Sequence, residues 1–123
     1  MIAVLIPCLN EEAAIGTVVR EFKVVLPDAT VFVYDNGSTD RTVDVARAAG
    51  AVVRCEPLKG KGNVMRRMFA DIEADIYVLV DGDNTYHVPS VTALIDLLVT
   101  QSLDMVNGAR EEKSHAAYRT GHR

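Results

Sequence analysis

Two carboxylates that could hold a metal ion, Asp81 and Asp83, lie one residue apart directly after the apolar run at residues 76–80. In an extended chain, residues two apart point to the same side, and Gly82 between them lets the backbone approach a ligand. Two close carboxylates repel unless a cation lies between them, and oxygen ligands favour hard ions. The pattern therefore predicts Mg²⁺ or Mn²⁺ with positions left open for phosphate oxygens. A turn is the alternative, since Asp, Gly and Asn are common turn residues.

A second candidate is the segment Lys59-Gly60-Lys61-Gly62, which precedes the helical pattern of residues 64–73. Glycine amides and a helix N-terminus attract phosphate, and lysines add positive charge. The segment is not a P-loop, because Gly62 follows the Gly-Lys pair, and Met65 replaces the third glycine of a dinucleotide fingerprint. A solvated basic loop is an equally good interpretation of this segment alone.

A third candidate, Asp35, ends a buried apolar run and is followed by Asn36. A carboxylate at this place can accept a hydrogen bond from a base N–H or from a ribose hydroxyl. The alternative is a cap for the helix that follows, although Ser38, Thr39 and Asp40 are also suited to capping.

The elements that must position these residues alternate between strand and helix patterns. Short apolar runs predict strands at 1–7, 30–35, 51–55, 76–80 and 104–110. Apolar residues at helical spacing predict helices at 10–27, 41–50, 64–73 and 89–101, with Asn10 as the N-cap of the first. This alternation favours an α/β fold, a mostly parallel sheet with helices on both faces.

In such a sheet, ligands bind beyond the carboxyl ends of the strands. Each predicted strand is followed by chemically useful polar residues: Asn10 and Glu11, Asp35 and Asn36, Lys59 and Lys61, Asp81 and Asp83, and Arg110. The coincidence of five such groups on one sheet edge predicts a single site there.

Composition sets the class of protein. The chain has 123 residues, 49% of them hydrophobic, and a net charge of −4, which indicates one folded domain. No basic stripe favours nucleic acid, and no apolar run is long enough to span a membrane. Without a signal peptide pattern, we expect a cytoplasmic protein in which Cys8 and Cys55 are reduced and buried. Residues 111–123 are polar and carry no apolar period, so we expect a polar tail that either frays or is cut before its next element.

Five segments, "IPCLNEE", "VYDNGSTDRT", "KGKGNVMRR", "VLVDGD" and "NGAR", in this order resemble family 2 glycosyltransferases of the GT-A fold. The resemblance covers about residues 2–110 and is strongest to the polyprenyl-phosphate hexose synthases, such as dolichol-phosphate mannose synthase. It implies a Rossmann-like nucleotide-sugar-binding domain at residues 1–110. Residues 111–123 would then begin a missing acceptor-side region.

The resemblance also implies roles by position. Pro7, Leu9 and Glu11 would line the nucleoside pocket, and Asp35, with Asn36, would contact the base or ribose. Asp81-Gly82-Asp83 would be the Asp-x-Asp motif, with Asp83 the main metal ligand, Asp81 nearer the ribose and sugar, and both catalytic. Arg110 would contact phosphate. The full set expected to bind the nucleotide sugar is Pro7, Leu9, Asn10, Glu11, Asp35, Asn36, Lys61, Asp81, Gly82 and Arg110.

The implied activity is inverting transfer of a hexose from a UDP- or GDP-linked sugar to a polyprenyl phosphate or another lipid or glycan acceptor. Mn²⁺ or Mg²⁺ would act as a Lewis acid on the diphosphate leaving group. The general base would lie in the missing region, and Thr85 stands where close relatives often carry a metal-binding Gln. The resemblance also suggests that the full-length protein associates peripherally with a membrane. The surface left open by the missing region suggests self-association.

Two other functions stay open. The chain could be a nucleotide-binding fragment without transferase activity, which the missing base would explain. It could instead be a sugar nucleotidyltransferase, but such enzymes usually carry a glycine-rich basic loop after the first strand. The acidic segment "PCLNEE" stands there and would repel a triphosphate.

Overall fold

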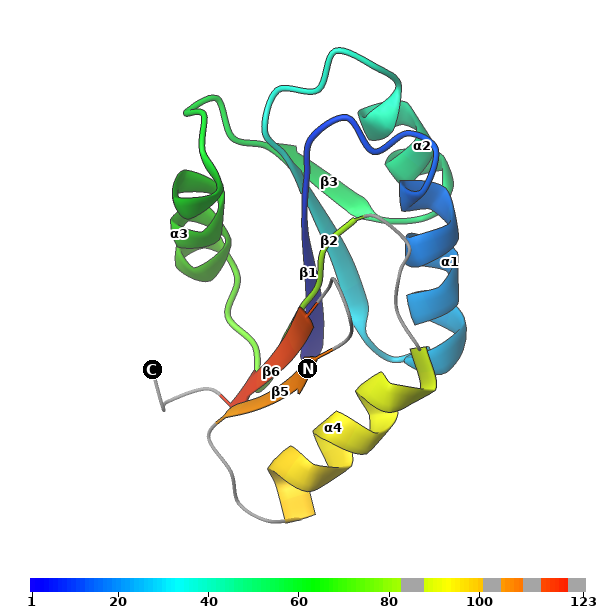
Figure 1. Cartoon of the computed structure of the whole chain (residues 1–123), viewed down its shortest axis with the longest axis vertical. Helices are drawn as coiled ribbons and strands as arrows, with labels where there is room; N and C mark the ends of the chain where they lie inside the picture. Colours follow the sequence, from blue (N-terminus) through cyan, green and yellow to red (C-terminus); the bar gives the residue numbers. More distant parts are fainter. Residues whose placement is uncertain (83–87, 101–104, 110–113, 120–123) are drawn as a thin grey trace.

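A computed structural model describes residues 1–82, 88–100, 105–109 and 114–119 of the chain. In these residues strands and helices alternate as far as the fifth strand, and a sixth strand follows it (Figure 1). In chain order the elements are β1 (Ile2–Cys8), α1 (Ile15–Val25), β2 (Thr30–Asp35), α2 (Thr42–Ala48), β3 (Val52–Cys55), α3 (Lys61–Asp71), β4 (Ile76–Leu79), α4 (Val88–Thr100), β5 (Met105–Ala109) and β6 (Ser114–Arg119).

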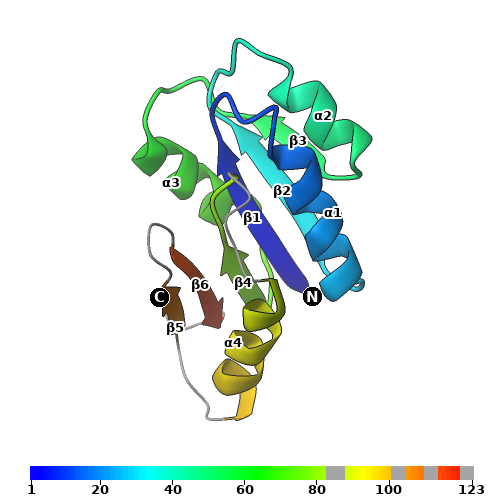
Figure 2. The same cartoon turned by 45° about the vertical axis from the view of Figure 1, so that its right-hand side comes forward.

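The strands form one sheet in the order β3-β2-β1-β4-β6-β5. β1 lies in the middle and pairs in parallel with β2 and β4, and β2 pairs in parallel with β3. β6 is inserted antiparallel between β4 and β5, as Figure 2 shows. The predicted α/β architecture with a mostly parallel sheet is therefore confirmed.

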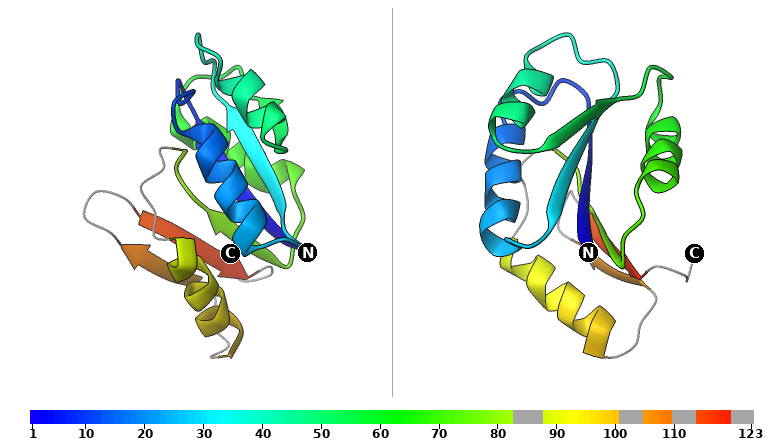
Figure 3. Two further views of the ribbon diagram at one scale, coloured as in Figure 1. Left: turned by 90° about the vertical axis from the view of Figure 1, so that its right-hand side faces the viewer. Right: turned by 180° about the vertical axis from the view of Figure 1, so that it is seen from behind.

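Helices cover both faces of this sheet. α1, α2 and α4 lie on one face, and α3 lies on the other (Figure 3). The central strand β1 serves both faces because successive side chains of a strand point in opposite directions. Val4 and Ile6 are buried toward α1, whereas Ala3 and Leu5 are buried toward α3.

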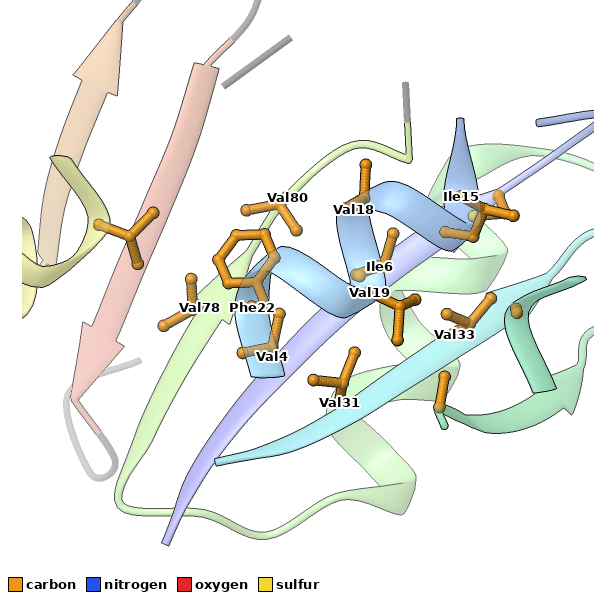
Figure 4. Packing of buried hydrophobic residues seen from close by; sticks show 14 of the residues in the cluster. Val4, Ile6, Ile15, Val18, Val19, Phe22, Val31, Val33, Val78 and Val80 are labelled. Carbon is orange, nitrogen blue, oxygen red and sulfur yellow. The ribbon is translucent and has the colours of Figure 1, made fainter. Parts of the chain in front are cut away.

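The larger core lies between α1 and the sheet. Val18, Val19 and Phe22 of α1 pack against residues of β1 and β2, including Val4 and Val31 (Figure 4). Phe22 is fully buried, and burial of a side chain of this size contributes about 1.5–3 kcal/mol. This packing holds α1 and β1 together and so sets the place of the loop between them.

Two predicted helix starts were wrong. α1 begins at Ile15 and not at Asn10, and its N-cap, Ala14, has no side-chain cap. Asn10 cannot be the N-cap because its φ of 54° lies in the left-handed region, while an N-cap residue takes an extended conformation. α3 begins at Lys61, three residues before the predicted start at Val64. The second lysine of the basic segment therefore belongs to the helix.

Two further expectations are corrected. We expected residues 111–123 to be a polar tail, but Ser114–Arg119 form β6, which lies between β4 and β5 in the sheet. Both cysteines are free as expected, yet only Cys8 is buried, because Cys55 lies exposed at the end of the edge strand β3. Among the helices that the structure describes, none is long and apolar enough to cross a membrane.

Candidate functional site

The carboxyl ends of three strands lie side by side at one edge of the sheet. Cys8 pairs with Asp35, and Asp35 pairs with Cys55, so β1, β2 and β3 end at the same level. The chain leaving β4 runs beside β1, where the Val80 N–H donates to the Leu5 carbonyl at 3.1 Å. The loops that follow these strands meet at the top of the view in Figure 1.

A cavity of about 560 Å³ opens at this edge. Seven of the residues predicted to bind the nucleotide sugar line it: Pro7, Leu9, Glu11, Asn36, Lys61, Asp81 and Gly82. Other described residues in its wall are Cys8, Lys59, Gly60 and Val64. The topology thus brings together residues from four separate loops, as an open parallel sheet predicts.

Gly82 lines the cavity where the chain after β4 packs closely against Cys8 and Glu11. A Cβ atom at this position would lie 2.6 Å from Cys8 Sγ and 3.6 Å from Glu11 Cγ. A side chain at residue 82 would therefore force Cys8 or the backbone to move. Because the glycine is small, the chain carrying Asp81 can lie directly against the end of β1.

Lys61 and Asp81 place opposite charges at the mouth of the cavity. Lys61 Nζ donates to Asp81 Oδ1 at 2.7 Å, and both side chains are accessible to solvent. An accessible ion pair contributes only about 0–1 kcal/mol to stability. Separation of the two charges therefore costs little free energy when an anion offers the lysine another partner, or when a cation approaches the carboxylate.

The amide of Asn36 holds the wall of the cavity that contains Lys59 and Gly60. Its Nδ2 donates to the carbonyls of Glu56 and Leu58, both at 2.9 Å. Its Oδ1 accepts a hydrogen bond from the Gly60 N–H, also at 2.9 Å. Asn36 thus contacts the cavity and also fixes the segment from residue 56 to residue 60.

Asp35 is engaged within its own turn. Its Oδ2 accepts hydrogen bonds from the N–H groups of Gly37 and Ser38, and its Oδ1 accepts one from the Ser38 hydroxyl. The side chain is buried and is not among the described residues that line the cavity. The structure therefore gives Asp35 a place in the turn, and a contact with base or ribose stays a prediction.

Asn10 joins two loops and also lies outside the cavity lining. Its Oδ1 accepts a hydrogen bond from the Thr39 N–H at 2.9 Å, and its own N–H donates to Ser38 Oγ at 2.8 Å. These bonds tie the loop after β1 to the loop after β2. A nucleotide contact by Asn10 stays a prediction.

Asp40 and Thr42, at the start of α2, accept two more hydrogen bonds from the loop after β1. The Thr42 hydroxyl donates to Asp40 Oδ1 and accepts a hydrogen bond from the Glu11 N–H at 2.8 Å. Asp40 Oδ2 also accepts from the Glu12 N–H at 3.3 Å. The hydrogen bond from Thr42 holds the pKa of the Asp40 carboxyl below its usual range, so this acceptor stays ionised at neutral pH.

A polar cluster that the sequence analysis missed anchors α3 to the sheet. The buried Tyr34 donates its hydroxyl to Asp71 Oδ2 at 2.8 Å, and Arg67 Nε donates to the same oxygen at 2.8 Å. Burial, and then the hydrogen bond to Asp71, raises the pKa of Tyr34. Arg67 also lies 3.9 Å from Glu56, whose Oε2 accepts from the Leu58 N–H. The sequence signal for this cluster was Tyr34, which follows the apolar residues of a predicted strand.

Two predicted residues, Asp83 and Arg110, lie outside the described residues, as does Thr85. The structure therefore describes one carboxylate of the predicted pair. Asp81 fits a hard cation, because it presents a carboxylate oxygen at the cavity mouth. Within residues 1–82 and the other described segments, no group of three or more His, Cys, Asp or Glu side chains could hold a metal.

Comparison with known proteins gives a family match over nearly the whole chain. Residues 3–123 match the model of glycosyl transferase family 2. Protein RfbJ of Shigella flexneri is 54% identical over 123 residues, which cover 99% of this chain and 95% of RfbJ. A dolichyl-phosphate hexose transferase of Haloferax volcanii is 32% identical over 113 residues, which cover 91% of this chain and 49% of that protein.

Solved structures agree with the sequence relatives. Glucosyl-3-phosphoglycerate synthase of Mycobacterium tuberculosis, in a complex with Mg²⁺ and UDP, has a TM-score of 0.83 at 27% identity. The likeness covers 97% of this chain and 56% of the synthase. The same synthase has been solved with Mn²⁺, UDP-glucose and phosphoglyceric acid. The chain thus spans about half the length of the synthase and of the hexose transferase, and nearly all of RfbJ.

Proposed function

The chain belongs to glycosyl transferase family 2, and from that premise we propose that its cavity binds a nucleoside diphosphate sugar together with Mn²⁺ or Mg²⁺. The sugar would be a hexose, transferred with inversion. The observation that carries the proposal is the cavity mouth, where the ammonium of Lys61 faces the carboxylate of Asp81 at 2.7 Å. A diphosphate bridged by a cation presents charges of both signs, and this pair offers a partner for each.

The cavity also has the parts that a nucleoside needs. Pro7 and Leu9 give it an apolar wall, and half of the Leu9 surface is accessible. Glu11, Asp81 and the backbone at Gly82 offer polar groups to the ribose and the sugar. We propose that Asp83 is the main metal ligand, that Asp81 lies nearer the ribose and sugar, and that Arg110 contacts phosphate.

The divalent cation would supply charge stabilisation when bound, because a diphosphate leaving group gains negative charge as the sugar departs. Lys61 would add a fixed positive charge from the first turn of α3. Asp81 would orient the cation and the ribose. The solved synthase with Mg²⁺ and UDP supports this choice of ligands.

The proposed acceptor is a polyprenyl phosphate. The relative from Haloferax volcanii is a dolichyl-phosphate hexose transferase, which supports a polyprenyl phosphate acceptor for this chain. We propose that such an acceptor is met at a membrane surface. The competing proposal is a module that binds nucleotide without transfer, and the general base for the acceptor is not assigned to any described residue. The third possibility, a sugar nucleotidyltransferase, is not proposed because the family match points to transfer of the sugar itself.

The test of binding is a thermal shift measured with UDP and with GDP, each with and without Mn²⁺. We expect one of the two diphosphates to raise the melting temperature in Mn²⁺ and to have little effect without it, because a ligand that binds only the folded state stabilises it. Asp83→Asn should remove most of the metal-dependent shift. The matched control is Asp28→Asn, which removes the same charge from an exposed residue before β2, at the opposite edge of the sheet.

The test of transfer uses the same protein with Mn²⁺, UDP-glucose or GDP-mannose, and a short-chain polyprenyl phosphate. Product formation above a control without protein supports the transferase. Diphosphate binding without product in any combination favours the nucleotide-binding module. A full metal-dependent shift of the melting temperature in Asp83→Asn would contradict the proposed metal site.

A further inference from the structure

The Asn36 amide makes an unusual number of contacts with a single segment. Its two N–H groups serve the carbonyls of Glu56 and Leu58, and its oxygen serves the N–H of Gly60. An asparagine amide has two donors, and both are used here. The residue is only 7% exposed, so water offers little compensation if these bonds are lost.

The segment held in this way leads directly into the part of the cavity wall that contains Gly60 and Lys61. Gly60 has a φ of 117°, a conformation that favours glycine, and it is the N-cap of α3. The next residue, Lys61, is the one whose ammonium reaches Asp81. A shift of residues 56–60 would therefore move both the start of α3 and the lysine.

Other anchors of the segment lie at its beginning. The Glu56 N–H donates to the Asp35 carbonyl at 2.9 Å, and Glu56 Oε2 accepts from the Leu58 N–H at 3.1 Å. Beyond Leu58, the Gly60 N–H joins the segment to Asn36, the residue that follows β2. Asn36 thus controls the part of the segment nearest to the cavity.

We infer that Asn36 is a positioning residue for diphosphate binding: it acts by placing the Gly60-Lys61 turn and not by contacting the base. This inference rests on the proposed function and changes the role that the family resemblance implied for Asn36. It separates the cavity into a nucleoside side built by the loop after β1 and a phosphate side built by the loop after β3.

Asparagine is needed here because both kinds of hydrogen-bonding group are used. In Asn36→Asp the carboxylate would still accept from Gly60, but it would face the carbonyls of Glu56 and Leu58 without a proton to donate. The buried Glu56 carbonyl and the partly buried Leu58 carbonyl would lose their donors beside a negative charge. Asn36→Asp is therefore the sharpest variant, and Asn36→Ala tests the loss of all three bonds.

The experiment compares the affinity for a diphosphate with the affinity for its nucleoside. UDP in Mn²⁺ and uridine are titrated into the wild type and both variants and followed by NMR; GDP and guanosine replace them if the wild type binds GDP. We expect the dissociation constant for the diphosphate to rise about tenfold or more, because a displaced Lys61 would lose its contact with a charged phosphate. The dissociation constant for the nucleoside should stay within about twofold of the wild-type value. Lys61→Ala should give the same pattern.

A second variant keeps the test valid if Asn36 variants are unstable. Gly60→Ala strains the backbone at φ 117° while leaving the Asn36 side chain in place, and the added methyl meets nothing closer than Asn63 Nδ2 at 3.6 Å. Because both residues act through one turn, the double variant should lose less diphosphate affinity than the sum of the single losses.

The outcomes separate this inference from the proposed function. Equal losses of diphosphate and nucleoside affinity in Asn36→Asp would show that Asn36 contacts the base, and would overturn the inference alone. A wild type that binds neither diphosphate would overturn the proposed function and the inference with it. Selective loss of diphosphate binding in Asn36→Asp and in Gly60→Ala supports both.

Discussion

The hydroxyl of Thr42 holds the backbone of Glu11: it accepts the Glu11 N–H at 2.8 Å although the two residues are 31 positions apart in the chain. Thr42 is polar and fully buried. Its hydroxyl proton goes to Asp40, so both of its hydrogen-bonding functions are used. This contact links the start of α2 to the loop that forms one wall of the cavity.

Loss of that hydroxyl should destabilise the fold. Thr42→Val keeps the shape of the side chain but leaves the Glu11 N–H without its acceptor, which should cost about 1–3 kcal/mol in the free energy of unfolding. Thr42→Ser keeps the hydroxyl and should lose less. Urea unfolding of the three proteins measures this, and equal stability of the wild type and Thr42→Val would show that the contact is not needed.

The close approach of Gly82 to Cys8 predicts a coupled pair. Gly82→Ala places a methyl group 2.6 Å from Cys8 Sγ and should cost about 1–3 kcal/mol of stability, as overpacking does. Removal of the sulfur in Cys8→Ala should relieve part of this cost in the double variant. Additive effects in the double-mutant cycle would contradict the contact.

The packing of α1 predicts a large loss at a single position. Phe22 is fully buried, so Phe22→Ala should lower the free energy of unfolding by about 3–5 kcal/mol. Val24 lies on the same helix and is 79% exposed, and Val24→Ala should change stability by no more than about 0.5 kcal/mol. Chemical unfolding measures the stability of both variants, and losses of similar size would show that Phe22 is not a core residue.

The cluster around Asp71 predicts a dependence on pH. The hydrogen bond from Tyr34, and then that from Arg67, holds the pKa of Asp71 below its ordinary 3.8. Because the folded-state pKa lies below the unfolded one, the stabilisation is fully present above pH 3.8 and is lost as the pH falls through the folded-state pKa.

Asp71→Asn should therefore be less stable than the wild type at neutral pH, and the difference should shrink in acid below that value. Urea midpoints measured from neutral pH down to about pH 2 give the comparison. Asp28→Asn, an exposed aspartate before β2, is the control and should follow the wild type. Parallel curves for Asp71→Asn and the wild type would show that the cluster gives no such stabilisation.

The elements of the fold followed from patterns in the sequence, because each buried strand is a short apolar run and each helix repeats its apolar residues at helical spacing. Local rules failed where tertiary contacts took over. Asn10 is a favourable N-cap by type, but its side chain bonds to Thr39 and its backbone turns into the left-handed region. β6 was missed because "SHAAYR" has no β-branched residue, and its pairing with β4 and β5 comes from residues far away in the chain.

The place of the cavity was predictable for a topological reason, since parallel strands bring their carboxyl ends to one edge. The role of each residue within the cavity was not predictable. Asp35, Asn36 and Asn10 have the same polar types as ligand-binding residues. Only the folded chain reveals that the Asp35 side chain bonds within its own turn, and that those of Asn36 and Asn10 bond to neighbouring loops. A one-dimensional pattern does not contain those distances.

The most direct measurement is an NMR titration of the labelled chain with Mn²⁺ and UDP, because paramagnetic Mn²⁺ broadens the amide signals of nearby residues. With both present, we expect broadening at Leu9, Gly60 and Gly82, which line the cavity, and none at Val24 or Asp28, which lie away from it. The broadening should weaken when UDP is omitted or when Asp83 is replaced by Asn. Unchanged signals at Leu9, Gly60 and Gly82, or broadening centred on Asp28, would contradict a metal–nucleotide site at this edge of the sheet.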